Sequence, residues 1–345
     1  MSAEGAFLQA CRGQATSYTP VWFMRQAGRY MAEYRAIRAK ASLLEICRRP
    51  DLAAEVTLQP VERLGVDAAI LFADILLPFE PLGLGLSFAQ GEGPVIARPI
   101  KSPADVARLP DVDPSDGLGY VLDAVRTIRK ALDGRVPLIG FAGAPFTLAS
   151  YAIEGGGTRD FIATKRFMYN QSDAWHALLE RLARLVGRYL AAQAGAGAQA
   201  LQLFDSWVGC LSPDDYRQYV QPHSATALSL AAESGVPVIH FGTGTSTLLE
   251  FMAQAGGDVI GVDWRISLDV AWSRLPGRGI QGNLDPAALL GPMDALEEKV
   301  RDVLRRAAGR AGHIFNLGHG VLQHTDPERA RAVVNLVHEW RSAGG

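Results

Sequence analysis

Short apolar runs recur along the whole chain, separated by longer segments with helical patterns, and this alternation is the strongest constraint on the fold. The runs cover residues 66–72, 137–142, 199–204, 236–241, 258–262, 278–281 and 313–317. Such alternation is typical of parallel strands joined by helical crossovers. Seven or eight such units without a nucleotide-binding fingerprint favour a closed (β/α)8 barrel of the TIM type over an open, doubly wound sheet.

Helix starts and chain length support the same architecture. Ser212, Asp285 and Asp326 each precede a proline, the pattern of an N-cap residue followed by Pro at the first helical position. The 345 residues fit one barrel with its insertions, and no low-complexity linker divides them. We therefore expect residues 1–345 to form a single barrel domain, with its active-site cleft at the C-terminal ends of the strands.

Composition excludes several classes of protein. The 34 basic and 36 acidic residues nearly balance, and no Lys/Arg block indicates binding to nucleic acid. The most apolar stretch, around residues 66–79, is interrupted by two aspartates, so no membrane span is expected. The three cysteines show no C-x-x-C spacing and predict neither a disulfide framework nor a zinc site. Together with an N-terminus that lacks a signal-peptide pattern, these features indicate a soluble cytoplasmic protein.

Two arginines, Arg25 and Arg29, lie four residues apart in the mostly apolar segment 20–30. If this segment is helical, both guanidinium groups share a face and can each bind a carboxylate through two hydrogen bonds. Gly28 between them would let a ligand approach the backbone closely. The alternative is an arginine pair on a solvated helix face. The apolar flanking residues favour the anion site.

Polar residues follow most of the predicted strands, where barrel enzymes place their catalytic groups. They are Asp74, Ser206, His240, Asp263, Asn283 and His319, with Tyr151 further along the loop after residues 137–142. Taken singly, each has a structural explanation; for example, Asp263 and Asn283 can cap turns or helices. Asp74 differs because apolar residues flank it on both sides. Its carboxylate must find several donors or have a raised pKa.

Six motifs, in order, strongly resemble the uroporphyrinogen decarboxylase family: PVWFMRQAGRY, LFADILLPFE, GFAGAPFTLASYAIEGGGT, LQLFDSWVG, IQGNLDP and FNLGHGVLQHTDPE. The resemblance extends nearly end to end. It implies a single (β/α)8 barrel, a homodimer, and no metal, nucleotide or prosthetic group. Matching the motifs residue by residue implies substrate contacts at Arg25, Gln26, Ala27, Gly28, Arg29, Asp74, Tyr151, Ser206 and His319, with Asp74 and Arg25 also catalytic.

The resemblance implies a carboxy-lyase that removes the four acetate carboxyls of uroporphyrinogen III as CO2 and yields coproporphyrinogen III. Arginines suit the carboxylate-rich rim of this substrate. Asp74 would accept hydrogen bonds from the pyrrole N–H groups and stabilise the cation formed when a pyrrole carbon is protonated. The proton donor stays open. Arg25 has a very high pKa for an acid, whereas His319 titrates in a better range but suits carboxylate recognition.

Two alternative functions remain. A zinc-dependent corrinoid methyltransferase of the same superfamily would need a His-x-Cys pair after a strand, but His240 is followed by Phe241 and Gly242. A non-catalytic tetrapyrrole-binding protein would keep the arginines yet would gain little from a carboxylate such as Asp74.

Overall fold

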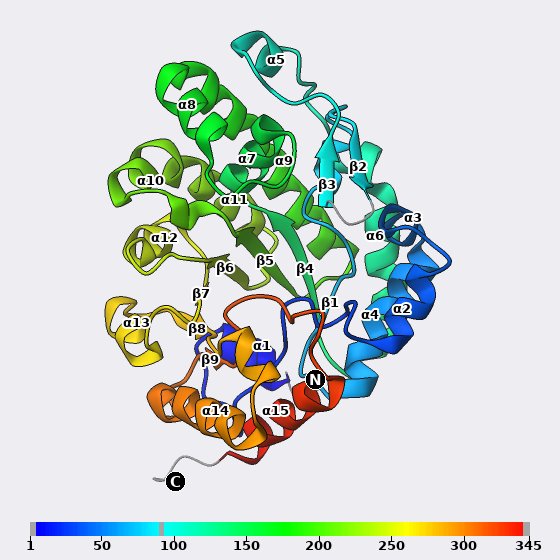
Figure 1. Ribbon diagram of the computed structural model, residues 1–345, viewed down its shortest axis with the longest axis vertical. Coiled ribbons are helices and arrows are strands. Elements are labelled where there is room, and N and C mark those ends of the chain that lie inside the picture. Colours follow the sequence, from blue (N-terminus) through cyan, green and yellow to red (C-terminus); the bar gives the residue numbers. More distant parts are fainter. Residues whose placement is uncertain (1–4, 90–92, 341–345) are drawn as a thin grey trace.

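The protein is built around a curled sheet of seven parallel strands with helices on its outside (Figure 1). The computed structural model describes residues 5–89 and 93–340. The strands follow one another in the order β1 (Ala69–Ile70), β4 (Leu138–Gly143), β5 (Ala200–Asp205), β6 (Val238–Gly242), β7 (Val259–Gly261), β8 (Gly279–Gln281) and β9 (His313–Ile314). Each coincides with one of the seven predicted runs, so the α/β barrel-type architecture is confirmed.

An extended segment, Pro20 to Trp22, fills the gap between the first and last strands. Val21 forms a parallel bridge with Phe315. The Phe315 N–H donates to the Pro20 carbonyl at 2.8 Å, and on the other side the Asp67 N–H donates to the Val21 carbonyl at 2.8 Å. Because its backbone groups pair in both directions, this segment takes the eighth position of the barrel and closes it.

The helices surround the sheet (Figure 1). They are α1 (Ala6–Cys11), α2 (Ala32–Arg38), α3 (Leu43–Arg48), α4 (Pro50–Leu64), α5 (Pro103–Ala107), α6 (Pro114–Leu132), α7 (Pro145–Glu154), α8 (Ile162–Asn170), α9 (Ser172–Ala196), α10 (Pro213–Tyr219), α11 (Gln221–Ala232), α12 (Leu249–Ala255), α13 (Leu268–Arg274), α14 (Met293–Ala307) and α15 (Pro327–Glu339), with 3₁₀ turns η1 (Leu77–Phe79), η2 (Val208–Cys210) and η3 (Pro286–Leu290).

The predicted N-caps are confirmed. Ser212 accepts from the Asp215 N–H at the start of α10, and Asp326 accepts from the Glu328 N–H at the start of α15. Asp285 also caps, but the element it starts is the 3₁₀ turn η3. An antiparallel hairpin of β2 (Leu86–Ala89) and β3 (Gly93–Ile96) lies outside the main sheet and was not predicted.

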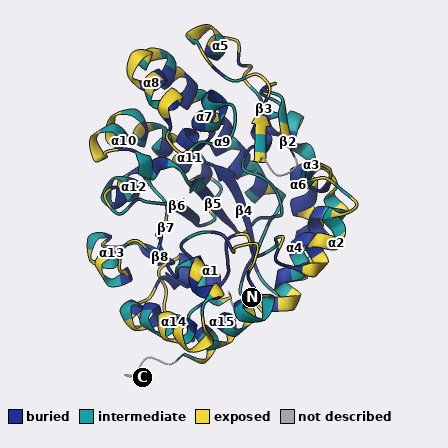
Figure 2. Ribbon diagram, viewed as in Figure 1, coloured by how far each residue is buried: buried dark blue, intermediate teal, exposed yellow. Residues whose placement is uncertain are grey.

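Burial follows the barrel geometry. The strands and the inner faces of the helices are buried, while the outer helical faces are exposed (Figure 2). Large side chains such as Trp22, Phe241 and Phe315 are fully buried. Two apolar clusters meet along the sheet, and residues of β1 and β5 pack against both. The strand ends are thus held in fixed positions relative to one another.

Asp67 joins the closing segment to the rest of the barrel, at the end of β1 opposite Asp74. Its carboxylate accepts from the Val21 N–H at 2.7 Å, the Tyr18 hydroxyl at 2.8 Å and the His338 Nε2 at 2.8 Å. We expect Asp67→Asn to lower the free energy of unfolding by about 1–3 kcal/mol. The asparagine amide has one acceptor oxygen and turns an N–H toward one of the three donors, so that donor loses its hydrogen bond. Urea unfolding measures this loss. A collapse of kcat in the folded variant would contradict a purely structural role.

Candidate active site

Arg25 lies in a tight turn, and the helix that would place Arg25 and Arg29 on one face does not form over residues 20–30. The backbone of Arg25 is left-handed, with φ of 58°, and the next helix, α2, begins only at Ala32. The physical reason is the barrel closure, which uses the Pro20 to Trp22 backbone groups for sheet pairing. Arg25 and Arg29 are therefore both exposed, but they do not share a helix face.

The remaining residues of this segment shape the turn. Gln26 is fully buried; its amide oxygen accepts from the Phe23 N–H at 3.1 Å and its amide nitrogen donates to the Ala68 carbonyl at 3.0 Å. The Gln26 side chain thus faces the barrel wall. Ala27 and Gly28 are partly exposed. A Cβ on Gly28 would lie 3.2 Å from the Arg25 carbonyl oxygen, so glycine permits the close turn.

Asp74 lies four residues beyond the end of β1 and is partly buried. One carboxylate oxygen accepts from the Leu76 N–H at 2.9 Å. Burial raises its pKa, while the Leu76 hydrogen bond and the charge of Arg25 oppose that rise. The side chain keeps some solvent access. The sequence expectation of an upward shift is confirmed: a single backbone donor and one cation do not offset the cost of burial.

Tyr151, on α7, lies beside Asp74. Burial, then the Asp74 charge, raises the pKa of Tyr151 to about 12, while Arg25 acts in the opposite direction. The phenol therefore stays protonated and can donate a hydrogen bond. Its ring stacks on Trp207, with centroids 3.7 Å apart and planes at 24°. Trp207 follows Ser206 at the end of β5, so this stack joins Tyr151 to Ser206.

His319 lies in the loop after β9, next to Arg25. The Gly320 N–H donates to the His319 Nδ1 at 2.7 Å, which leaves Nε2–H as the outward donor of the neutral ring. Burial, then the charges of Arg25 and Arg265, lowers the pKa of His319 to about 4. The expectation that His319 titrates near neutrality is therefore wrong. The ring is a neutral hydrogen-bond donor at pH 7.

The His319 loop and the Arg25 turn are also joined through the backbone. The Val321 N–H donates to the Met24 carbonyl at 2.9 Å. A Cβ on Gly320 would lie 2.4 Å from the Arg25 Cδ. Glycine at position 320 therefore leaves the space in which the Arg25 side chain runs toward the site.

Arg29 is placed at the rim rather than over Asp74. Its charge acts on Tyr34, where it opposes the rise in the tyrosine pKa that burial causes. The Tyr34 ring packs on Phe72, two residues before Asp74, at a centroid distance of 5.4 Å. Arg25 therefore acts on Asp74 directly, whereas Arg29 is connected to it through Tyr34 and Phe72.

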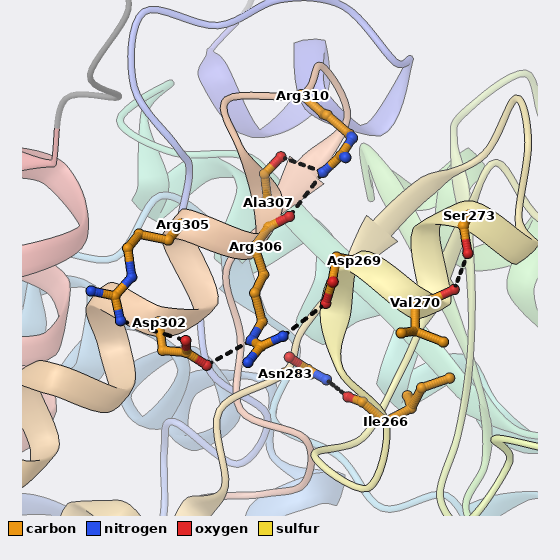
Figure 3. Close-up of polar contacts among 10 residues, drawn as sticks. All are labelled: Ile266, Asp269, Val270, Ser273, Asn283, Asp302, Arg305, Arg306, Ala307 and Arg310. Atoms are coloured by element: carbon orange, nitrogen blue, oxygen red, sulfur yellow. Dashed lines mark hydrogen bonds and ion pairs between the residues drawn. The ribbon is translucent and has the colours of Figure 1, made fainter.

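Three other residues from the strand ends have structural partners. His240 lies within β6, fully buried, with its Nδ1 3.3 Å from the Met252 carbonyl; burial lowers its pKa to about 4. Asn283 donates to the carbonyl oxygens of Asp263 and Ile266 at 2.9 and 2.7 Å, the second contact being drawn in Figure 3. Asp263 accepts from the Gly244 and Arg265 N–H groups at 2.6 and 3.0 Å.

A cavity of about 380 Å³ opens beside Ser206. Its lining includes Thr158, Phe161, Ser206, Trp207, Thr243 and Arg265. Sequence reasoning missed Trp207 and Arg265. Arg265 follows the predicted strand 258–262 by three positions, so its place at a strand end was the available signal.

Asp205, the last residue of β5, supports this part of the site. It is fully buried and accepts from the Thr147 hydroxyl at 2.9 Å, and the Thr147 oxygen accepts from the Trp207 N–H at 3.3 Å. Burial raises the pKa of Asp205 from 3.8 to about 7. The carboxyl therefore keeps its proton in the folded protein over a range where the unfolded chain has lost it.

This shift predicts how stability varies with pH. Between pH about 4 and about 7 the folded state binds one more proton, so the contribution of Asp205 to stability falls as pH rises and levels off above 7. We expect Asp205→Asn to remove a slope of up to about 1.4 kcal/mol per pH unit. Urea unfolding of wild type and variant from pH 5 to 8 measures it. Parallel curves would show that Asp205 does not titrate there.

Residues 5–89 and 93–340 contain neither a cluster of metal ligands nor a helix that could span a membrane. No three His, Cys, Asp or Glu side chains converge there as metal ligands. Every helix in these ranges is too short or too polar to traverse a bilayer.

The groups described above define a class of protein: a barrel enzyme whose C-terminal mouth combines cations, neutral donors and one partly buried carboxylate. A family model for uroporphyrinogen decarboxylase (URO-D) matches residues 2–340. The chain is 60% identical to uroporphyrinogen decarboxylase from Sorangium cellulosum, over 96% of this chain and 95% of that protein. It is 57% identical to the one from Carboxydothermus hydrogenoformans, over 97% and 96%. The chain belongs to the uroporphyrinogen decarboxylase family.

Solved structures of lower identity share the fold. A methyltransferase from Methanosarcina mazei superposes with a TM-score of 0.82 over 97% of both chains, at 20% identity. A putative vitamin-B12 independent methionine synthase from Listeria monocytogenes gives a TM-score of 0.57 at 12% identity, over 94% of this chain and 97% of that one. At these identities the likeness shows the barrel architecture alone.

Proposed function

We propose that this chain catalyses the decarboxylation of uroporphyrinogen III to coproporphyrinogen III, releasing the four acetate carboxyls as CO2. Near full-length identity of 51–60% to proteins named uroporphyrinogen decarboxylase carries this conclusion. The same comparison favours it over a corrinoid methyltransferase or a tetrapyrrole carrier. The chemistry of the mouth agrees with a polycarboxylate substrate, since cations and neutral donors surround one carboxylate.

We propose that Asp74 binds the centre of the macrocycle. The pyrrole N–H groups of a flexible tetrapyrrole can turn to one face, where a carboxylate accepts several of them. Asp74 accepts a hydrogen bond from Leu76 through one oxygen, and its partly exposed carboxylate can accept more. When a pyrrole carbon is protonated, positive charge reaches the ring nitrogen, and a fixed negative charge in a partly desolvated site stabilises it. Loss of CO2 then discharges the cation and leaves an exocyclic methylene, which takes up a proton to become the methyl group while the ring carbon gives up the proton it received.

Arg25, Arg29, Tyr151, Ser206 and His319 are proposed to hold carboxylates and the ring edge. The guanidinium groups supply charged donors, and the neutral His319 Nε2–H and the Tyr151 hydroxyl supply uncharged ones. In this assignment Gln26, Ala27 and Gly28 contribute through the backbone of the turn. Each of these roles is tested by substitution and steady-state kinetics.

The electrostatics of the site argue against His319 as the proton donor. His319 carries no extra proton at neutral pH, because its pKa is about 4. A neutral imidazole is a very weak acid, so carboxylate recognition suits it better. We propose Arg25 as the group nearest the reacting carbon, where it passes a proton to that carbon and is reprotonated from solvent.

Anaerobic incubation with chemically reduced uroporphyrin III tests the proposed function. Chromatography should resolve products with seven, six, five and four carboxyls in turn. We expect the same rate after exhaustive treatment with EDTA and without any added cofactor. Unchanged substrate retained on the protein would support a carrier instead. Activity lost to EDTA and restored by zinc would overturn the cofactor-free mechanism.

We further propose that residues 1–345 act as one domain, that two copies form a homodimer and that the protein works in the cytoplasm. These proposals follow the family resemblance. Sedimentation equilibrium of the purified chain tests the second: a mass of one chain at micromolar concentration would contradict it.

A further inference from the structure

The polar groups of the site follow the barrel strands around the mouth. Arg25 comes from the closing segment, Asp74 from the loop after β1, Tyr151 from helix α7 after β4 and Ser206 from the end of β5. His319 follows β9. A substrate with carboxylates all round its rim needs a cation on the arc between Ser206 and His319 as well, over the ends of β6, β7 and β8.

Arg265 occupies that arc, three residues beyond an expected strand and four beyond the observed end of β7. Its side chain is 51% exposed and lines the same cavity as Ser206 and Thr158. The charge of Arg265 also acts on His319. It lowers the pKa of the imidazole, and this effect is larger than the opposite effect of the Asp263 charge.

The Arg265 guanidinium is also held in place. It lies over the Trp264 ring, 4.2 Å from its centroid, and Nη1 is paired with the buried Asp263 carboxylate. Asn283 fixes the loop through the carbonyl oxygens of Asp263 and Ile266, and Figure 3 draws the contact with Ile266. Among the described residues Asp263 is the acceptor that Arg265 contacts, so Nε and Nη2 remain for a ligand.

We propose that Arg265 binds a propionate carboxylate of the tetrapyrrole and is a specificity-determining residue of this site. The proposal rests on the proposed decarboxylase function and adds a contact to it. A propionate is the better occupant than an acetate, because a persistent ion pair stabilises a carboxylate in the ground state and so opposes its loss as CO2. Propionates are retained through all four steps, so this contact serves substrate, intermediates and product alike.

The test compares Arg265→Gln and Arg265→Lys with wild type. Arg217→Gln is the matched control, because Arg217 is also an exposed arginine paired with a nearby aspartate, Asp214 at 3.1 Å on α10, but lies on an outer helix. The measurements are kcat and KM for uroporphyrinogen III, and the Kd of the product coproporphyrinogen III from anaerobic calorimetry. Thermal unfolding of each variant checks the fold.

We expect Arg265→Gln to raise KM about tenfold, as for one lost charge-assisted hydrogen-bonded pair, with a smaller change in kcat. The Kd of coproporphyrinogen III should rise by the same factor, and Arg265→Lys should recover part of both. Unchanged KM and Kd in Arg265→Gln would overturn the proposal. A raised KM for uroporphyrinogen III with an unchanged Kd for coproporphyrinogen III would mean that Arg265 binds an acetate, and it would overturn the proposal that Arg265 binds a propionate.

Failure of the proposed function looks different. Wild-type protein could bind coproporphyrinogen III without decarboxylating uroporphyrinogen III. That result would refute the decarboxylase function, and the Kd values of wild type and Arg265→Gln would still decide the role of Arg265. Wild-type protein that binds neither tetrapyrrole would refute both. Equal losses in Arg265→Gln and Arg217→Gln would show a general effect of surface charge and contradict a specific contact.

Discussion

Asp74→Asn is expected to lower kcat by about 10²–10³ while most of the fold and some tetrapyrrole affinity remain. The amide keeps the size of the side chain and one oxygen that can accept from the Leu76 N–H, but it removes the negative charge beside the cationic pyrrole. Loss of a fixed opposite charge in a desolvated site costs about 3–4 kcal/mol of transition-state stabilisation. Single-turnover decarboxylation, compared with the Kd of coproporphyrinogen III, measures the two effects separately.

Asp67→Asn is the matched control, since the same substitution at the other end of β1 removes hydrogen bonds to Tyr18, Val21 and His338. We expect it to lower stability more than turnover, and Asp74→Asn to do the reverse. If Asp74→Asn turns over like wild type, or loses activity only in proportion to unfolded protein, Asp74 is structural and the proposed mechanism fails.

Arg25→Gln is expected to lower kcat/KM by about 10- to 150-fold, the range for a lost hydrogen bond to a charged group. It should also change the pH dependence. The Arg25 charge lowers the pKa of Asp74 against the effect of burial, so its removal raises that pKa further. In the proposed mechanism the ionised Asp74 is the active form, so the fall of activity on acidification should begin at a higher pH in the variant. Rates measured from pH 4 to 8 show this shift.

Gly320→Ala separates the position of the Arg25 guanidinium from its charge. The added Cβ would lie 2.4 Å from the Arg25 Cδ. The Arg25 side chain must therefore move, while the charges of Arg25 and Asp74 both remain. We expect Gly320→Ala to raise KM. The pH at which activity falls on acidification should shift less than it does in Arg25→Gln. An unchanged KM would mean that the present path of the Arg25 side chain is not the one used to bind substrate.

Most of the barrel could be predicted because its signals are local. A buried parallel strand must be apolar along its length, so the seven runs were visible as contiguous segments. Caps such as Ser212 and Asp326 act within three residues and were equally visible. The β2–β3 hairpin has no such contrast in its sequence, which explains why it was missed.

The Arg25 turn could not be predicted, because its conformation depends on residues far away in the chain. Spacing alone allows a helix over residues 20–30. Only the pairing of Val21 with Phe315 and of Gln26 with Ala68 makes the extended segment and turn more favourable. The same limit applied to His319, whose suitability as an acid depended on burial and on the charges of Arg25 and Arg265.

The sequence by itself determined the kind of fold and the family and pointed to Asp74 as the candidate central carboxylate, because these inferences depend on residue types at short spacings. Tertiary structure decided which groups meet. It closed the barrel with Pro20 to Trp22, held His319 neutral and brought Arg265 to the mouth beside Ser206. Distances across the mouth and the cost of burying charge arise only when strands distant in sequence pack together, and no local pattern records them.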